Sequence, residues 1–149
     1  MKNSWLFAAG ILSSAASLLH FATIIGGPNW YRLFGAGEEM ARAAERGSAM
    51  PGLVTGAIAL LLAVWALHAF SAAGLIRRLP LLRTALVLIT SVYLVRGLVL
   101  FPLLAIKPEL VDTFAVVSSL VVLFYGVVYA IGTWLAWPRL RSETPLRPV

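Results

Sequence analysis

Residues 53–76 read LVTGAIALLLAVWALHAFSAAGLI, a stretch of the chain without a formal charge. A helix that crosses the hydrocarbon core of a bilayer needs about 20 mainly apolar residues, and this stretch is longer than that. Three further runs of similar composition occur at residues 5–25, 84–106 and 113–137. The pattern predicts an all-α, polytopic membrane protein in which four transmembrane helices form one bundle, over residues 1–137.

The composition excludes most other classes of protein. The chain has 149 residues, of which 60% are hydrophobic and 12% charged, whereas a soluble domain has about 25% charged residues. A water-soluble globule and a disordered chain are both excluded. With no cysteine, the chain has no disulfide, thiolate metal site or thiol nucleophile. A net charge of +6 in so apolar a chain favours membrane lipids as partners and not nucleic acid.

The first run also has the features of a secretory signal peptide, because Lys2 precedes it and Ala15 and Ala16 offer small residues near a cleavage point. Its apolar character continues to Ile25. This length exceeds the usual apolar region of a signal peptide, so we expect a retained helix.

The basic residues are distributed unequally between the two sides of the predicted bundle. Seven Lys and Arg lie on the side that holds both termini and the second loop, and four lie on the other side together with five of the six acidic residues. The first group is Lys2, Arg77, Arg78, Arg83, Arg139, Arg141 and Arg147, and the second is Arg32, Arg42, Arg46 and Lys107. The positive-inside rule therefore predicts a protein of the cytoplasmic (inner) membrane with both termini in the cytoplasm.

The first outer loop, residues 26–52, contains a second structural signal. Glu38 and Glu39 begin a short segment that ends with Arg46 and is followed by Gly47. Acidic residues in a first turn, a basic residue in a last turn and a following glycine are typical of a helix, here over residues 38–46. We expect this helix to lie at the membrane interface, and we expect a flexible cytoplasmic tail over residues 138–149.

Each run carries small or polar residues at intervals of three and four, which places them on one helix face. These residues are Gly10, Ser13, Ser17 and His20; Gly52, Gly56, Ala59, Ala63 and Ala66; Thr90, Tyr93, Arg96 and Gly97; and Ser118, Tyr125, Tyr129 and Gly132. In the second run the stripe indicates packing alone, and Gly52 and Gly56 predict a contact with a second copy of the chain. In the others the polarity exceeds what packing requires, so either a polar cavity or simple helix association explains them.

Arg96 is the residue that needs an explanation. An arginine within the hydrocarbon costs a few kcal/mol unless it is paired or reaches water. The four runs contain no acidic residue, so a carboxylate partner must come from a loop. We hypothesise that Glu38 or Glu39 folds back and pairs with Arg96. The alternative is that Arg96 extends to water or headgroups while the acidic residues remain on a surface helix.

The proline at position 102 follows Arg96 by six residues. A proline inside a helix removes one backbone hydrogen bond, so we expect it to bend the outer end of the third span.

Three classes of function remain open. The first, which we prefer, is a non-enzymatic protein that binds a small anionic or lipid ligand in an outward-facing pocket. The second is a membrane enzyme acting on a lipid or quinone-like substrate, and the third is a structural or accessory subunit. The candidate pocket residues are Arg96, His20, Tyr93, Glu38, Glu39, Ser17, Ser118 and Tyr125. No catalytic motif is present, so we assign no catalytic residue, metal ligand or cofactor.

Overall fold

The structure is a computed structural model that describes residues 3–141. The elements are α1 (Ser4–Gly26), α2 (Pro28–Leu33), α3 (Glu38–Glu45), α4 (Met50–Ala73), α5 (Leu82–Leu98), α6 (Leu100–Ile106), the 3-10 turn η1 (Pro108–Leu110) and α7 (Thr113–Arg141). The described residues contain no β-strand.

The expected fold class is confirmed. Four helical segments are long and apolar enough to cross a membrane, namely Ser4–Gly26, Met50–Ala73, Leu82–Ile106 and Thr113–Leu140. The third of these comprises α5 and α6 together. The short helix expected at residues 38–46 is present as α3, and Arg46 is its C-cap residue.

Helix α4 begins and ends three residues earlier than expected, and its ends explain this. Pro51 lies in its first turn, where the missing N–H costs no helical hydrogen bond. The helix ends at Ala73 because Gly74 adopts a left-handed conformation with φ 82° and donates to the carbonyls of Phe70 and Ser71.

Helix α7 extends four residues beyond the expected end at Trp137. Pro138 lies inside the helix near its C-terminal end, where its missing N–H removes only the hydrogen bond to the carbonyl of Trp134, and the helix continues past it to Arg141. Arg78 donates to the carbonyl of Leu140 at 3.3 Å, and the Leu140 side chain is buried. These contacts hold the last turn in place. The rest of the tail, residues 142–149, lies outside the described residues.

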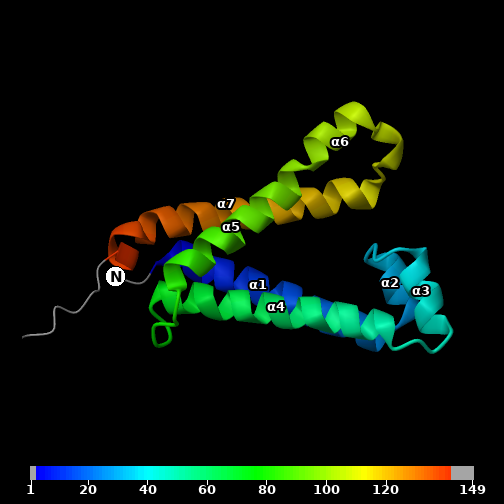
Figure 1. The fold of residues 1–149 in the computed structure, drawn as a ribbon, viewed down its shortest axis with the longest axis horizontal. Coiled ribbons are helices and arrows are strands. Elements are labelled where there is room, and N and C mark those ends of the chain that lie inside the picture. The colour runs from blue at the N-terminus through cyan, green and yellow to red at the C-terminus, as the bar shows by residue number, and fades with distance from the viewer. Residues whose placement is uncertain (1–2, 142–149) are drawn as a thin grey trace, which may run out of the picture.

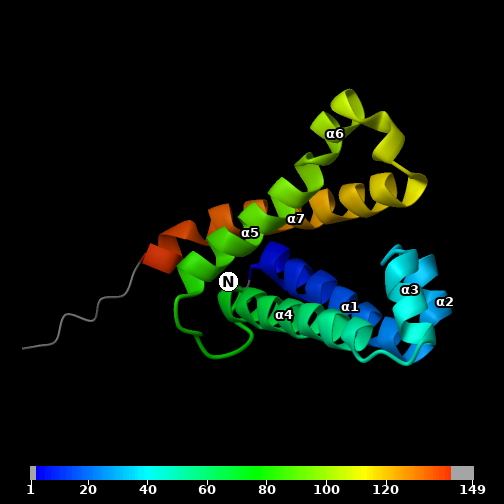
Figure 2. The ribbon, with the colours of Figure 1, turned by 45° about the vertical axis from the view of Figure 1, so that its right-hand side comes forward.

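The four long helices form two antiparallel pairs, α1 with α4 and α5 with α7 (Figure 1). The two pairs come together at the end where α1 begins and α7 finishes, and they diverge toward the other end (Figures 1 and 2). We call the first the closed end, which includes the loop 74–81, and the second the open end, which carries α2, α3 and α6. At the open end the two halves meet where the Phe114 ring lies against Gly35.

Glycines allow the helices to approach closely. A Cβ atom added to Gly97 would lie 2.6 Å from Cβ of Leu123, and one added to Gly126 would lie 3.0 Å from the backbone nitrogen of Leu94. These two glycines therefore fix both the spacing and the register of α5 against α7. Asn3 caps α1 and also donates to the carbonyl of Gly132 at 2.8 Å, which joins α1 to α7 at the closed end.

The two pairs are joined by a cluster of hydroxyl and aromatic groups that we call the crossing cluster: Ser13, Trp65, Tyr93, Tyr125 and Tyr129. The Ser13 hydroxyl lies 3.3 Å from that of Tyr93 and 2.8 Å from that of Tyr129. The Tyr129 hydroxyl donates to the carbonyl of Trp65 at 3.3 Å, and the rings of Trp65 and Tyr93 meet edge to face at 5.0 Å. All four long helices therefore contribute to this cluster.

The third span is bent as expected. Helix α5 ends at Leu98 and α6 begins at Leu100. Pro102 has no N–H to donate to the carbonyl of Leu98, which interrupts the helix at this point. Beyond the break α6 leans away from α7 (Figures 1 and 2).

Candidate functional site

A cavity of about 680 Å³ lies between α5, α6 and the first turns of α7. We call it the Arg96 cavity. Its lining residues are Ser91, Val92, Val95, Arg96, Val99, Leu100, Leu103, Ala115 and Ser119. Most of these side chains are aliphatic, and Arg96 is the charged residue among them. The bend between α5 and α6 separates α6 from α7, so Pro102 contributes to the space.

The Arg96 side chain points toward the open end. Because Gly97 packs against Leu123, the backbone of Arg96 lies close to the level of Leu123. Its guanidinium, however, donates from Nη1 to the Ser119 hydroxyl at 3.0 Å, one helical turn nearer the open end. This direction corresponds to the alternative in which Arg96 extends toward water or headgroups.

The polar groups around Arg96 are hydrogen-bond donors. Among residues 3–141, no acidic side chain forms an ion pair with Arg96. The Ser119 oxygen accepts one guanidinium N–H, which leaves its own O–H available as a donor beside the remaining N–H groups of Arg96. Such a site matches a group that only accepts hydrogen bonds, and carboxylates and phosphates have this property.

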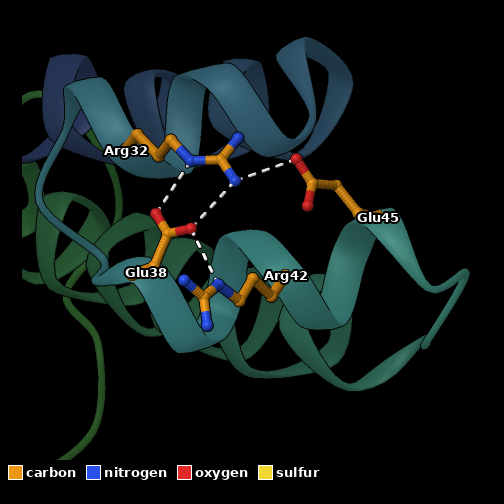
Figure 3. A network of polar contacts seen from close by, with 4 residues as sticks. All are labelled: Arg32, Glu38, Arg42 and Glu45. Atoms are coloured by element: carbon orange, nitrogen blue, oxygen red, sulfur yellow. Dashed lines mark hydrogen bonds and ion pairs between the residues drawn. The ribbon is translucent and has the colours of Figure 1, made fainter.

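The hypothesised pairing of Arg96 with Glu38 or Glu39 is not formed. Glu38 accepts hydrogen bonds from Arg32 at 2.8 and 3.1 Å and from Arg42 at 3.0 Å (Figure 3). Arg32 also pairs with Glu45 at 2.8 Å. Partners four and six residues away are available at a smaller cost in chain entropy than a residue on a distant helix, and they satisfy Glu38 locally.

This network sets the protonation of Glu38. Hydrogen bonds from Arg32 and then Arg42 lower the pKa of the Glu38 carboxyl from its ordinary 4.5 to about 2. Glu38 correspondingly raises the pKa of Arg32. Glu39 is exposed in the first turn of α3. The acidic loop residues therefore cap the open end of α1 and α4, away from the Arg96 cavity.

Tyr93, Tyr125 and Ser17 serve helix packing. Tyr93 and Tyr125 belong to the crossing cluster, with ring centroids 5.7 Å apart. Ser17 is buried and donates to the carbonyl of Ala59 at 2.8 Å, which links α1 to α4. None of the three lines the Arg96 cavity.

His20 and Ser118 bond to their own helices. The Nδ1 atom of His20 lies 2.8 Å from the carbonyl of Ala16, and Ser118 donates to the carbonyl of Ala115 at 3.3 Å. Of the eight residues proposed from the sequence, the structure thus brings Arg96 alone to the cavity.

Two cavity residues, Ser91 and Ser119, were not predicted from the sequence. Ser119 adjoins Ser118 in the sequence, and choosing between them requires the rotation of α7 relative to α5. Ser91 lies five residues before Arg96, a spacing outside the three- and four-residue intervals that defined the stripe. The close contacts of Gly97 with α7 and of Gly126 with α5 fix this rotation. These two glycines are therefore the sequence signal that could have identified Ser119.

The glycine pair of α4 faces α1 of the same chain. The nearest atoms to a Cβ added at Gly52 or Gly56 belong to Ile24, at 3.8 and 3.7 Å. The residues described by the structure include no group of three or more His, Asp or Glu side chains placed to hold a metal ion.

The fold and its cavity define a small α-helical membrane protein with four spanning helices. Comparison of the chain with known protein families, curated proteins and solved structures gives no match. The function is therefore inferred from the cavity itself.

Proposed function

We propose that the protein is a non-enzymatic membrane protein that binds a ligand with an anionic group at Arg96. The observation that supports this most directly is the Arg96–Ser119 pair, at 3.0 Å, on the wall of a cavity of about 680 Å³. Its volume lies within the range of about 300–1,000 Å³ that is typical of ligand sites.

The cost of placing Arg96 within a spanning helix supports the same proposal. Insertion scales put that cost at about 2.5–3.5 kcal/mol for a central arginine. A hydrogen bond to the neutral Ser119 hydroxyl offsets part of it, and an anion offsets more because charge-assisted hydrogen bonds are roughly twice as strong. A bound anion thus supplies a countercharge for Arg96, which forms no ion pair with an acidic side chain among residues 3–141.

The ligand site belongs, in this proposal, to the outer leaflet of the cytoplasmic membrane. The closed end carries Arg77, Arg78, Arg83 and Arg139 in its described part, whereas the open end carries the described acidic residues. This asymmetry favours a cytoplasmic closed end, and the cavity then opens toward the outside.

An enzymatic role is less well supported. It would need His20, Tyr93 and a loop glutamate to converge on a substrate. Tyr93 instead bonds to Ser13, the His20 ring to its own helix and Glu38 to Arg32. Ligand binding at Arg96 requires no such convergence.

The test measures thermal unfolding of the full chain in a non-ionic detergent, with inorganic phosphate or phosphatidylglycerol as the probe. Saturation by either probe should raise the Tm of the wild-type protein by about 5 °C. Arg96→Gln should abolish this rise. Arg46→Gln, which removes an exposed arginine outside the cavity, is the matched control and should retain it. A rise of equal size in Arg96→Gln would refute the proposal.

A further inference from the structure

Seven of the nine residues that line the Arg96 cavity form one continuous strip along α5 and α6. They are Ser91, Val92, Val95, Arg96, Val99, Leu100 and Leu103. The strip covers twelve residue steps, which is about 18 Å at 1.5 Å per residue. Arg96 lies near its middle, and the rest of the strip is aliphatic except at Ser91. The cavity is therefore an elongated apolar groove with a charged centre.

A free inorganic anion would fill only a small part of this space. A cavity of about 680 Å³ is many times larger than the share of a water molecule, about 30 Å³, and a phosphate ion is only a few times larger than water. An inorganic ion at Arg96 would leave the aliphatic walls without contacts. A ligand that also carries a hydrocarbon chain would cover them.

The groove is accessible from the side of the bilayer. Val95 is 62% exposed and Val99 is 49% exposed, and both line the cavity. In a spanning helix such exposed apolar side chains face lipid. A membrane lipid therefore reaches the groove sideways, without crossing water.

The charge of the groove selects the headgroup. Arg96 is the one charged residue among the nine lining residues, and the hydroxyl of its neighbour Ser119, which accepts from Arg96, has an O–H of its own to donate. One guanidinium balances one negative charge, and the donor groups offer nothing to a quaternary ammonium. The groove thus favours a monoanionic headgroup over a zwitterionic one.

On the basis of the proposed function, we infer that the ligand is a membrane lipid with a single anionic headgroup, held laterally in the Arg96 cavity. Its headgroup meets the guanidinium and Ser119. One of its acyl chains follows Val95 and Val92 toward the closed end, because Arg96 extends toward the open end and lipid headgroups lie beyond it on that side.

The experiment uses native mass spectrometry of the full chain in a non-ionic detergent with equimolar phosphatidylglycerol and phosphatidylcholine. We expect one retained phosphatidylglycerol per chain, about tenfold in excess of phosphatidylcholine. Millimolar inorganic phosphate should not displace it. Equal retention of the two lipids would overturn the inference.

Two matched variants test the hydrocarbon part of the groove. Val92→Trp fills the part of the groove that the acyl chain follows and should reduce phosphatidylglycerol retention about tenfold. Val121→Trp is the control, because Val121 is 47% exposed, compared with 50% for Val92, and lies outside the cavity. It should retain the lipid as the wild type does. If Val92→Trp lowers the Tm, Val95→Trp replaces it.

The outcomes separate this inference from the proposed function. If inorganic phosphate raises the Tm through Arg96 while Val92→Trp leaves lipid retention unchanged, the anion site stands and the lipid groove is refuted. If Arg96→Gln retains phosphatidylglycerol as well as the wild type does, both are refuted. If the wild type binds neither phosphate nor phosphatidylglycerol, both are also refuted.

Discussion

Arg96 and Ser119 form the polar centre of the cavity because α5 and α7 approach closely where Gly97 and Gly126 lie. The short distance between the helix axes lets the guanidinium cross from one helix to the other. Ser119 is only 2% exposed, so packing fixes the position of its hydroxyl. Ser119 therefore both orients Arg96 and supplies a donor of its own.

Replacing Ser119 by alanine should weaken binding of phosphatidylglycerol about three- to tenfold, because one hydrogen bond contributes about 0.5–1.5 kcal/mol. The measurement is a lipid titration followed by Tm. Ser118→Ala is the matched control, since its hydroxyl bonds to a carbonyl of its own helix. Equal weakening in both variants would show that the loss of packing, and not the hydroxyl of Ser119, causes the effect.

The contrast between these two serines shows why the sequence predicts the fold and not the site. The four spans follow from the length of apolar runs, which is a local property. The identity of the Arg96 partner depends on the rotation of α7 against α5, which arises only in the packed bundle. Likewise, Glu38 pairs with the nearby Arg32 and Arg42. The composition alone does not show that Glu38 pairs with these two residues and not with the distant Arg96.

Pro102 determines the shape of the cavity. It divides the third span into α5 and α6, and α6 then leans away from α7 (Figure 1). Leu100 and Leu103 of α6 thereby form part of the cavity wall. The bend was predictable from the sequence, because proline acts on its own helix, whereas the cavity that it opens was not.

Pro102→Ala should restore the hydrogen bond to the carbonyl of Leu98, straighten the span and narrow the cavity. The wild-type chain has no cysteine, so spin labels can be attached through Leu104→Cys in α6 and Val117→Cys in α7. The distance between the two labels reports directly how far α6 lies from α7. The label-to-label distance should shorten, and phosphatidylglycerol retention should fall. Pro138→Ala is the control, because α7 continues through Pro138 without a break. An unchanged distance in Pro102→Ala would contradict this role.

The network that joins α2 to α3 should depend on pH. The pKa of Glu38 is lowered from 4.5 to about 2, so its contribution to stability is fully present above about pH 4.5 and disappears as the pH falls toward 2. Hydrogen exchange in α3, corrected for the intrinsic pH dependence of exchange, should show faster opening across this window. Glu38→Gln should show faster opening already at neutral pH. If hydrogen exchange in α3 responds neither to the fall in pH nor to Glu38→Gln, the stabilising role assigned to Glu38 is contradicted.

The two helix pairs are held together mainly through the closed end and the crossing cluster. The hydroxyls form a directed chain in which Tyr93 donates to Ser13, Ser13 to Tyr129 and Tyr129 to the carbonyl of Trp65. This direction follows because the carbonyl can only accept. The chain connects α5, α1, α7 and α4 in turn, so it stabilises the divergent arrangement that leaves the Arg96 cavity free of the first helix pair.

Tyr129→Phe should therefore destabilise the association of the two pairs. It removes two hydrogen bonds, to Ser13 and to the Trp65 carbonyl, while the ring still fills its place. Hydrogen bonds between membrane helices contribute about 0.6 kcal/mol on average and at most about 1.7 kcal/mol, so the expected loss is about 1–2 kcal/mol. Unfolding in mixed micelles of increasing dodecyl sulfate content measures it. Tyr125→Phe provides the matched control, because Tyr125 contributes its ring to the same cluster and no hydroxyl to the chain. Equal stability of Tyr129→Phe and Tyr125→Phe would mean that ring packing alone holds the two pairs together.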